Sequence, residues 1–259
     1  MELGQRTAAE RLRRELNAEH PESVPSKMGL ALVLEKEGRL ADAVEHNRRA
    51  VAAAPEEAPP QRELVSRLMR LEKLDEAVLA CREALRVAPS DSELHTLLGM
   101  APLHQARSAP REREPPSALS ASSKRSETEA FRHLRLACQL SLSSFQAFDK
   151  LAWVLATYPD AHWRNGAEAV ELAERVCGQT DFRVAETVGT LAVAYAEAGR
   201  FPEAINVAQR AQALSRSLGQ MQMAELQGEW INLFRAKQPY REQLTSFGTK
   251  ASQSSPTIP

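Results

Sequence analysis

One short sequence motif, called the phrase below, occurs three times in the chain. This repetition restricts the possible folds more than any other feature. Residues 34–44 read LEKEGRLADAV, residues 68–78 read LMRLEKLDEAV, and residues 195–205 read YAEAGRFPEAI. Ala43 and Ala77, in the first two phrases, stand 34 residues apart. The same interval relates five further pairs: Leu30 and Leu64, Leu34 and Leu68, Leu40 and Leu74, Ala50 and Ala84, Pro55 and Pro89. Repetition at this period predicts a stack of similar helical units.

Each copy of the phrase is typical of two helices joined by a turn. Apolar residues recur at helical spacing on both sides of Gly38. Glycine tolerates the left-handed backbone conformation that ends a helix. The small side chains of Ala43 and Ala50 allow the two helices to pack closely, and Pro55 ends the second helix or starts the next. Because a single hairpin cannot bury its apolar face alone, stacked copies are needed to form a continuous core.

This pattern resembles the tetratricopeptide-repeat family, whose period is also about 34 residues. In the copy at 24–57 the pattern residues are Leu30, Ala31, Leu34, Gly38, Leu40, Ala43, Ala50 and Pro55. Glu72 replaces the turn glycine in the copy at 58–91, and Arg216 replaces the closing proline in the copy at 185–218. The resemblance implies an all-α, right-handed α-solenoid of about five helix–turn–helix repeats with a C-terminal capping helix. The last repeats and the segment FRAKQPYRE are similar to the ends of bacterial members.

The period also divides the chain into segments. Residues 105–127 interrupt the third repeat as an insertion that is rich in Ser, Pro, Arg and Glu and is predicted to be disordered. Because of this insertion, the next alanine of the pattern is Ala130. The segment YPDAHWRN lengthens the turn of the fourth repeat. In order, the predicted segments are a partial repeat or N-terminal capping helix (1–22), repeats 1 and 2 with the first helix of repeat 3 (23–104), the disordered insertion (105–127), the second helix of repeat 3 with repeats 4 and 5 (128–218), the C-terminal capping helix (219–242) and a disordered tail (243–259).

The sequence carries no pattern that indicates catalysis or metal binding. The glycine-rich phosphate-binding motifs, the nucleophile elbow and the paired-histidine zinc motif are all absent. The six histidines do not cluster, and we expect His46 and His133 to be solvated. Cys81 and Cys177 lie among apolar residues of second helices, where a buried, inert thiol is the expected role. We therefore predict that this chain is not an enzyme and holds no cofactor or metal.

Charge and hydropathy limit the classes of partner. The formal net charge of -1 provides no overall attraction to nucleic acid or to acidic membranes. No apolar stretch reaches the ~20 residues that a membrane-spanning helix needs, and the charged N-terminus lacks the apolar region of a signal peptide. We predict a cytoplasmic protein whose partner is a protein or peptide, with neither nucleic acid nor a membrane span.

The family resemblance places the candidate binding residues on the first helix of each repeat, along the concave groove. Arg62 and Arg70 would hold carboxylates of a partner, and Met69 or Trp153 would receive an apolar side chain, although core packing is an equal alternative for Trp153. The predicted groove residues are Lys36, Arg62, Met69, Arg70, Asp149, Trp153 and Glu197. Met28 and Leu32 stand where family members that bind chaperone C-terminal tails carry Lys and Asn, which disfavours such tails.

The sequence thus predicts a non-catalytic protein–protein interaction scaffold or adaptor that binds a peptide or protein segment in the concave groove. The alternative is a C-terminal targeting or substrate-presenting array of a larger enzyme, glycosyltransferase-like, whose catalytic domain is not in this chain. The half-repeat at residues 5–21 motivates this alternative. Nucleic-acid binding by a basic inner face is a weaker third hypothesis.

Overall fold

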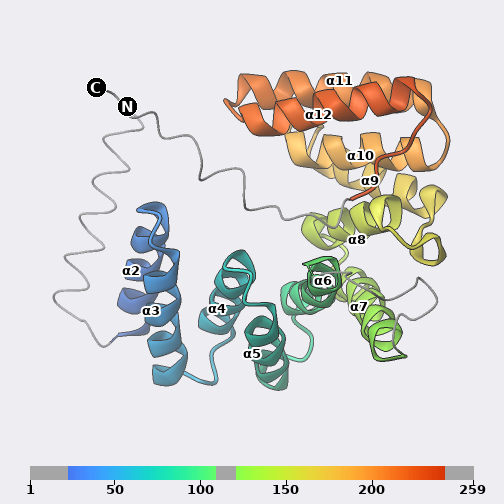
Figure 1. Ribbon diagram of the computed structural model, residues 1–259. Coiled ribbons are helices and arrows are strands. Elements are labelled where there is room, and N and C mark those ends of the chain that lie inside the picture. Colours follow the sequence, from blue (N-terminus) through green and yellow to red (C-terminus); the bar gives the residue numbers. More distant parts are fainter. Residues whose placement is uncertain (1–22, 109–120, 243–259) are drawn as a thin grey trace, which may run out of the picture. The chain divides into compact units, whose positions relative to one another are not determined.

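The chain folds into a series of antiparallel helical hairpins (Figure 1). The computed structural model describes residues 23–108 and 121–242. Within these ranges there are eleven α-helices and one short 3₁₀ helix, and no strand. The elements are α2 (Val24–Lys36), α3 (Leu40–Ala53), α4 (Ala58–Arg70), α5 (Leu74–Val87), α6 (Ser92–Ser108), α7 (Ala121–Leu140), α8 (Phe145–Thr157), η2 (Ala161–Trp163), α9 (Gly166–Gln179), α10 (Ala185–Glu197), α11 (Phe201–Ser217) and α12 (Met221–Arg235).

Consecutive helices pair as the period predicts. The hairpins are α2–α3, α4–α5, α6–α7, α8–α9 and α10–α11, and α12 packs on α11 as a final single helix. The predicted all-α array of five repeats with a C-terminal capping helix is confirmed. The array consists of two compact units, which we call the N-terminal module (α2–α7) and the C-terminal module (α8–α12). Residues 1–22 and 243–259 lie outside the described residues, so the partial repeat and the disordered tail stay predictions.

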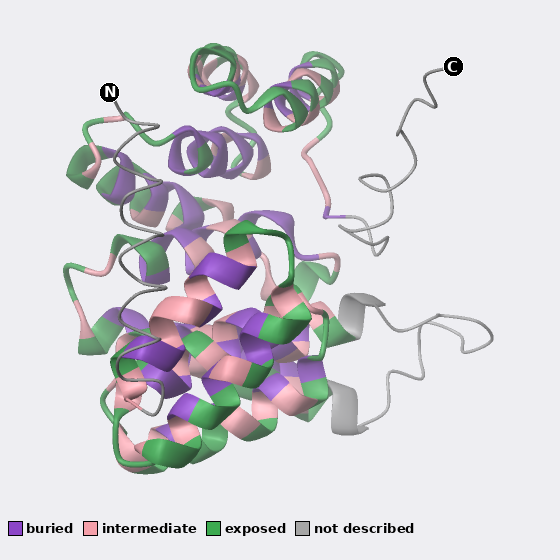
Figure 2. Cartoon of the chain, turned by 90° about the vertical axis from the view of Figure 1, so that its left-hand side faces the viewer, coloured by how far each residue is buried: buried purple, intermediate pink, exposed green. Residues whose placement is uncertain are grey.

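Small side chains allow the paired helices to approach closely. Ala31 on α2 and Ala43 on α3 meet in one buried cluster within the first hairpin. The pattern alanines Ala31, Ala43, Ala50, Ala77, Ala84, Ala152, Ala169, Ala192, Ala204 and Ala211 are all fully buried. In Figure 2 the buried residues gather where helices face one another, while the turns are exposed. Each alanine methyl therefore sits at a contact that a larger side chain would force apart.

The third repeat differs from the predicted boundaries of its insertion. Helix α6 continues to Ser108 and α7 begins at Ala121, so both helices enter the range predicted to be disordered, and residues 109–120 lie outside the described part. Helix α7 brings Ala130 against α6, as the pattern requires. A Cβ atom added to Gly99 of α6 would come within 2.9 Å of the Ala130 carbonyl oxygen. Gly99 and Ala130 therefore form the close contact of this hairpin.

The turns in the three copies of the phrase are closed by the same two backbone hydrogen bonds. After α2, the Arg39 amide donates to the Leu34 carbonyl at 2.9 Å and the Gly38 amide to the Glu35 carbonyl at 3.0 Å. These two bonds define the Schellman motif, which needs a left-handed residue after the helix. Gly38 supplies it with a φ of 78°.

The other two copies of the phrase form the same motif. The left-handed residue has a φ of 76° at Gly199 and of 57° at Glu72, the position where the sequence departs from glycine. The repeat thus imposes the left-handed conformation even on a side chain that disfavours it.

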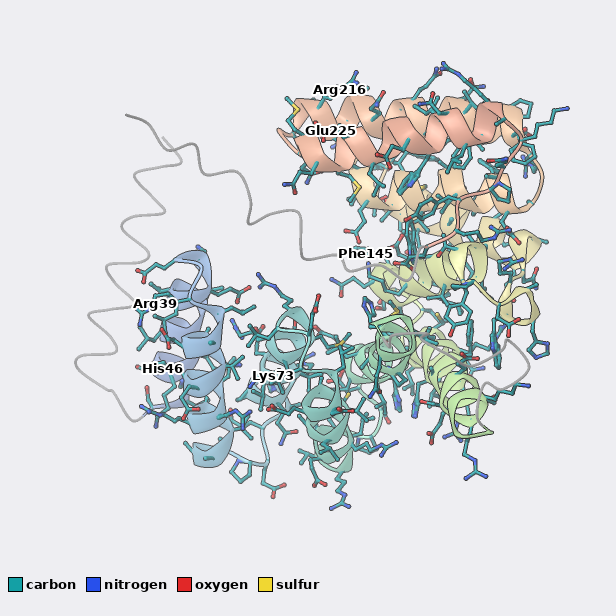
Figure 3. The ribbon with its side chains drawn as sticks, in the orientation of Figure 1. Arg39, His46, Lys73, Phe145, Arg216 and Glu225 are labelled. Carbon is teal, nitrogen blue, oxygen red and sulfur yellow. The ribbon has the colours of Figure 1, made fainter. Side chains whose placement is uncertain are left out.

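A basic residue follows the left-handed residue in each copy and pairs with an acidic residue three positions later. Arg39 Nη2 lies 2.7 Å from Asp42 Oδ2, and the Lys73 ammonium lies 3.3 Å from Glu76. Arg200 Nε lies 3.0 Å from Glu203 in the last copy. Arg39 and Lys73 are labelled in Figure 3, each next to a turn. Because these side chains are largely exposed, the pairs contribute little to stability, but they explain why charges recur in the phrase.

Closing prolines fix the length of the second helices. Helices α3 and α5 end two residues before Pro55 and Pro89, respectively. Where Arg216 replaces the proline, α11 continues to Ser217 and reaches 17 residues instead of 14. This agrees with the inability of proline to continue a helix.

We expect the substitution Glu72→Gly to stabilise the N-terminal module by about 0.5–1 kcal/mol, because glycine removes the strain of the left-handed conformation. Gly38→Ala should destabilise it by about 1 kcal/mol, although open space surrounds Gly38. Denaturant unfolding of each variant measures the difference. Glu72→Gln, which keeps a Cβ atom, is the control and should match the wild type. An equal stability of the glycine and glutamine variants would contradict the strain argument.

Candidate functional site

In the N-terminal module, the chain itself supplies acidic partners for the predicted groove arginines. Arg70 on α4 forms an ion pair with Glu35 on α2. Arg62 Nη1 lies 3.2 Å from Glu93 and 3.5 Å from Asp91. Lys36 is exposed and Met69 is partly buried. The structure therefore places all four predicted residues of this module on first helices, but the two arginines are already neutralised by neighbouring repeats.

A buried arginine that was not among the predicted groove residues lies between the first two repeats of this module. Arg67 on α4 has a side chain only 4% exposed, and it lies 2.8 Å from Glu35 and 2.6 Å from Glu63. The amide of the fully buried Asn47 on α3 lies 3.1 Å from Arg67 Nη1. Arg67 thus links three helices of two repeats. The periodic pattern could not reveal it, because Arg67 occupies a position that the repeat leaves free.

In the C-terminal module, the predicted residues Asp149, Trp153 and Glu197 have three different environments. Asp149 on α8 is only 4% exposed, and burial raises the pKa of its carboxyl group. Trp153, one turn further along α8, is partly buried, as is Glu197 at the end of α10. Trp153 and Glu197 are therefore reachable from the surface, whereas Asp149 belongs to the packing between α8 and α10.

Three aromatic rings from distant parts of the chain meet over α10. The ring centroids of Trp153 on α8 and Trp230 on α12 lie 5.7 Å apart. The ring of Tyr240, beyond the end of α12, lies 5.3 Å from Trp230 and 6.0 Å from Trp153. A Cβ atom added to Gly189 of α10 would lie 3.2 Å from the Trp230 ring, so the glycine makes room for it. These separations are typical of favourable aromatic pairs.

Residues 238–242 form an extended segment that runs back from α12 to α8 across the first helices of this module (Figure 1). The Glu242 amide donates to the Thr157 carbonyl at 3.1 Å. The indole Nε1 of Trp153 donates to the Glu242 carboxylate at 3.0 Å. Arg241 Nη2 lies 2.6 Å from Glu197 Oε2, and Arg241 Nη1 donates to the Ala156 carbonyl at 3.4 Å. We call Gln238–Glu242 the C-terminal segment.

Glu197 receives a second cation from the lengthened turn of the fourth repeat. Arg164, just after η2, donates from Nε to Glu197 Oε1 at 3.0 Å. The same guanidinium donates to the carbonyls of Tyr158 and Pro159 at 3.0 and 2.7 Å. The lengthened turn of the fourth repeat therefore positions the carboxylate of Glu197. The motif FRAKQPYRE was the only sequence signal that could have pointed to Arg241 and Glu242.

Comparison with known proteins agrees with this architecture. A family model described as tetratricopeptide repeat matches residues 1–58. A thermophilic tetratricopeptide-repeat protein of Thermus thermophilus has a similar structure, with a TM-score of 0.64 at 16% identity over 80% of this chain and 98% of that one. This chain carries the tetratricopeptide-repeat fold.

Two larger proteins share the fold over part of their length. The match to the Cut9–Hcn1 hetero-tetramer of the APC/C has a TM-score of 0.66 at 14% identity and covers 82% of this chain and 38% of that one. The match to yeast Tom70 has a TM-score of 0.61 at 15% identity and covers 88% and 43%, respectively. No curated protein matches the sequence. At these identities the likeness is one of fold alone.

Cysteines and histidines of the tetratricopeptide array serve the packing between helices. The thiol of Cys81 donates to the Leu94 carbonyl at 3.1 Å, and that of Cys177 to the Thr187 carbonyl at 3.5 Å. Each bond joins a second helix to the first helix of the next repeat. Burial raises the pKa of both thiols to about 12, so they stay protonated, as expected of inert buried cysteines.

His133, for which a solvated side chain was expected, is partly buried and pairs with a second histidine. Its Nδ1 lies 2.9 Å from Nδ1 of His95, and the two rings stack with centroids 5.1 Å apart. His95 Nε2 lies 3.0 Å from the Pro89 carbonyl, which can only accept, so that nitrogen carries a proton. The Nδ1–Nδ1 bond then needs one unprotonated nitrogen. The pair therefore tolerates at most one positive charge.

In the ranges 23–108 and 121–242, no group of three or more His, Cys, Asp or Glu residues could hold a metal ion. In the same ranges no helix combines the length and the apolar character needed to cross a membrane.

Removal of the Arg67 guanidinium should destabilise the N-terminal module strongly. We expect Arg67→Ala to cost about 2–3 kcal/mol, because it removes an almost fully buried side chain together with its contacts to Glu35, Glu63 and Asn47. Arg70→Ala is the matched control: Arg70 contacts the same carboxylate but is 53% exposed, so its loss should cost less than about 1 kcal/mol. Urea unfolding of both variants tests this, and equal costs would contradict the central role of Arg67.

Acidification should destabilise the α6–α7 hairpin through His133. Burial, reinforced by the nearby His95, lowers the pKa of His133 below its ordinary value of 6.5. The unfolded chain therefore takes up a proton at a higher pH than the folded chain does. Stability is constant above about pH 6.5 and falls as the pH drops below it. Thermal unfolding between pH 8 and 5.5 should show a smaller decrease for His133→Gln than for the wild type.

Two further histidines calibrate this pH experiment. His162→Gln, at an exposed position, should reproduce the wild-type decrease. His46 also has a pKa lowered by burial, so some pH dependence remains in the His133 variant. Identical pH profiles for wild type and His133→Gln would rule out the His133 mechanism.

Proposed function

We propose that this chain is a non-catalytic scaffold or adaptor that binds extended segments of partner proteins on the first-helix face of its repeats. The observation that carries the proposal is the C-terminal segment itself. An extended stretch of chain lies across α8, α10 and α12 and is held through Trp153 and Glu197, two residues that were predicted to bind a peptide. A face that holds one extended segment has the chemistry to hold others.

The two modules offer different chemistry to a partner. The C-terminal face combines aromatic rings, the Glu197 carboxylate and backbone carbonyls at the end of α8, which suits a segment with aromatic and basic side chains. The N-terminal face combines Lys36 and Met69 with Arg62 and Arg70, whose charges the nearby acids offset. A partner carboxylate at Arg62 or Arg70 has to compete with those acids, so this face favours apolar and neutral polar contacts.

The proposal assigns no chemistry to the buried titratable groups. Asp149, Cys81 and Cys177 lie inside the helix packing, where substrates do not reach them. The interpretation of this array as the C-terminal part of a larger enzyme stays a prediction. Partner identity, in either case, is decided by the variable residues of the first helices, because the repeat pattern uses the others for packing.

Affinity capture with the full chain tests the proposal. The face variant carries Arg62→Gln, Met69→Ala and Glu197→Gln, which remove contacts without introducing like charges. The control variant carries Glu45→Gln and Arg49→Gln, two exposed residues of the second helix α3. We expect a partner that wild type and control retain and that the face variant loses by about tenfold or more in affinity. Circular dichroism confirms equal folding of the three proteins.

A specific partner that all three proteins bind equally would place the binding surface elsewhere. Loss of the partner by the control variant alone would move the site to the second helices.

A further inference from the structure

The structure that follows α12 differs from the structure that follows the first helix of a repeat. Helix α12 ends in the same Schellman turn as the repeats, with the Gln238 amide donating to the Leu233 carbonyl at 2.9 Å and Lys237 at a φ of 55°. A second helix would normally follow such a turn. Here Pro239 holds the chain extended, and the next residues turn back over the first helices instead of pairing with α12.

Three consecutive residues of the segment make three separate contacts with the face. The Tyr240 ring packs against Trp153 and Trp230. Arg241 pairs with Glu197 and donates to the Ala156 carbonyl. Glu242 accepts from the Trp153 indole and donates its amide to the Thr157 carbonyl. Each of the aromatic, arginine and acidic residues thus meets a chemically complementary group on the face.

The residues of the face still contact one another when the contacts of the C-terminal segment are left out. Glu197 still has Arg164 at 3.0 Å. Trp153 and Trp230 still pack against each other across α10. Helices α8, α10 and α12 remain joined through α9 and α11, which they also contact. Departure of the segment therefore leaves no isolated buried charge.

We infer that the C-terminal segment is an internal ligand, which occupies the binding face of the C-terminal module and competes with partner segments of the same pattern. The inference rests on the proposed function. It adds the chemistry of the ligand and a mechanism that limits the access of partners to the face. A partner for this face presents an extended aromatic–arginine–acidic sequence. Because the segment is tethered to α12, its local concentration is high, about millimolar for a short flexible link. The apparent affinity for a partner equals the intrinsic affinity multiplied by the fraction of chains whose face is open.

Peptide binding to the full chain tests the inference. The probe is a fluorescent peptide of sequence KQPYREQL, copied from residues 237–244, and its control has the arginine replaced by glutamate. The released protein carries Tyr240→Ala and Arg241→Gln. Fluorescence anisotropy should show that the released protein binds the probe about tenfold or more tighter than wild type, and that the control peptide binds neither. Adding Glu197→Gln to the released protein should abolish the gain.

A milder variant and a folding measurement keep the test decisive. Arg241→Gln alone removes the ion pair with Glu197 and the hydrogen bond to the Ala156 carbonyl, and should give intermediate affinity. Arg235→Gln, on the exposed end of α12, is the matched control and should behave as wild type. Both released variants should keep the wild-type circular dichroism. Unfolding of the C-terminal module in Arg241→Gln would show that the segment is a structural part of the core and would overturn the inference.

The remaining outcomes separate this inference from the proposed function. Equal probe affinity of wild-type and released protein would exclude competition by the segment. No probe binding by a folded released protein would exclude recognition of the pattern, yet the capture experiment could still succeed through other residues. A wild-type chain that is dimeric in size-exclusion chromatography, with a monomeric Arg241→Gln variant, would place the segment on a second copy and overturn its role as an internal ligand.

Discussion

The close contact between the two helices of each hairpin is the constraint on which the rest of the structure depends. Fully buried alanines at fixed positions bring the helix backbones together, and at Gly99 even a methyl group would not fit against Ala130. Where the connection between the two helices is short, as after α2, α4 and α10, it reverses the chain through a left-handed residue. The Schellman turns and the left-handed Glu72 serve this short reversal.

These dependencies explain how much of the fold the sequence could predict. A residue that serves the hairpin recurs every period, so Ala43, Gly38 and Pro55 could be recognised without a structure. Ala130 was also recognisable despite its displacement, because the helix that follows the insertion needs a small residue at its contact with α6. The exact ends of α6 and α7 were not, since a composition rich in Ser, Pro, Arg and Glu favours disorder, whereas both helices extend into this range.

The environment of the candidate binding residues was less predictable, for the same physical reason. First-helix positions could be assigned by register, but their environment depends on neighbours that the register does not specify. Arg62 and Arg70 meet acids from adjacent repeats, and Asp149 is covered by α10. Glu197 lies between Arg164 from an irregular turn and Arg241 from the C-terminal segment. Irregular segments are not periodic, and here they supply both cations that meet Glu197.

The buried thiols give the two modules separate reporters of local opening. Cys81 and Cys138 lie in the N-terminal module and Cys177 in the C-terminal one, and all three are buried and free of disulfides. A thiol that is buried and protonated reacts with an alkylating reagent only in molecules that have opened around it. The rate at which each cysteine is modified is thus a measure of how often its own part of the array comes apart. A tandem array in which neighbouring repeats differ in stability would show that difference residue by residue, without any engineered label.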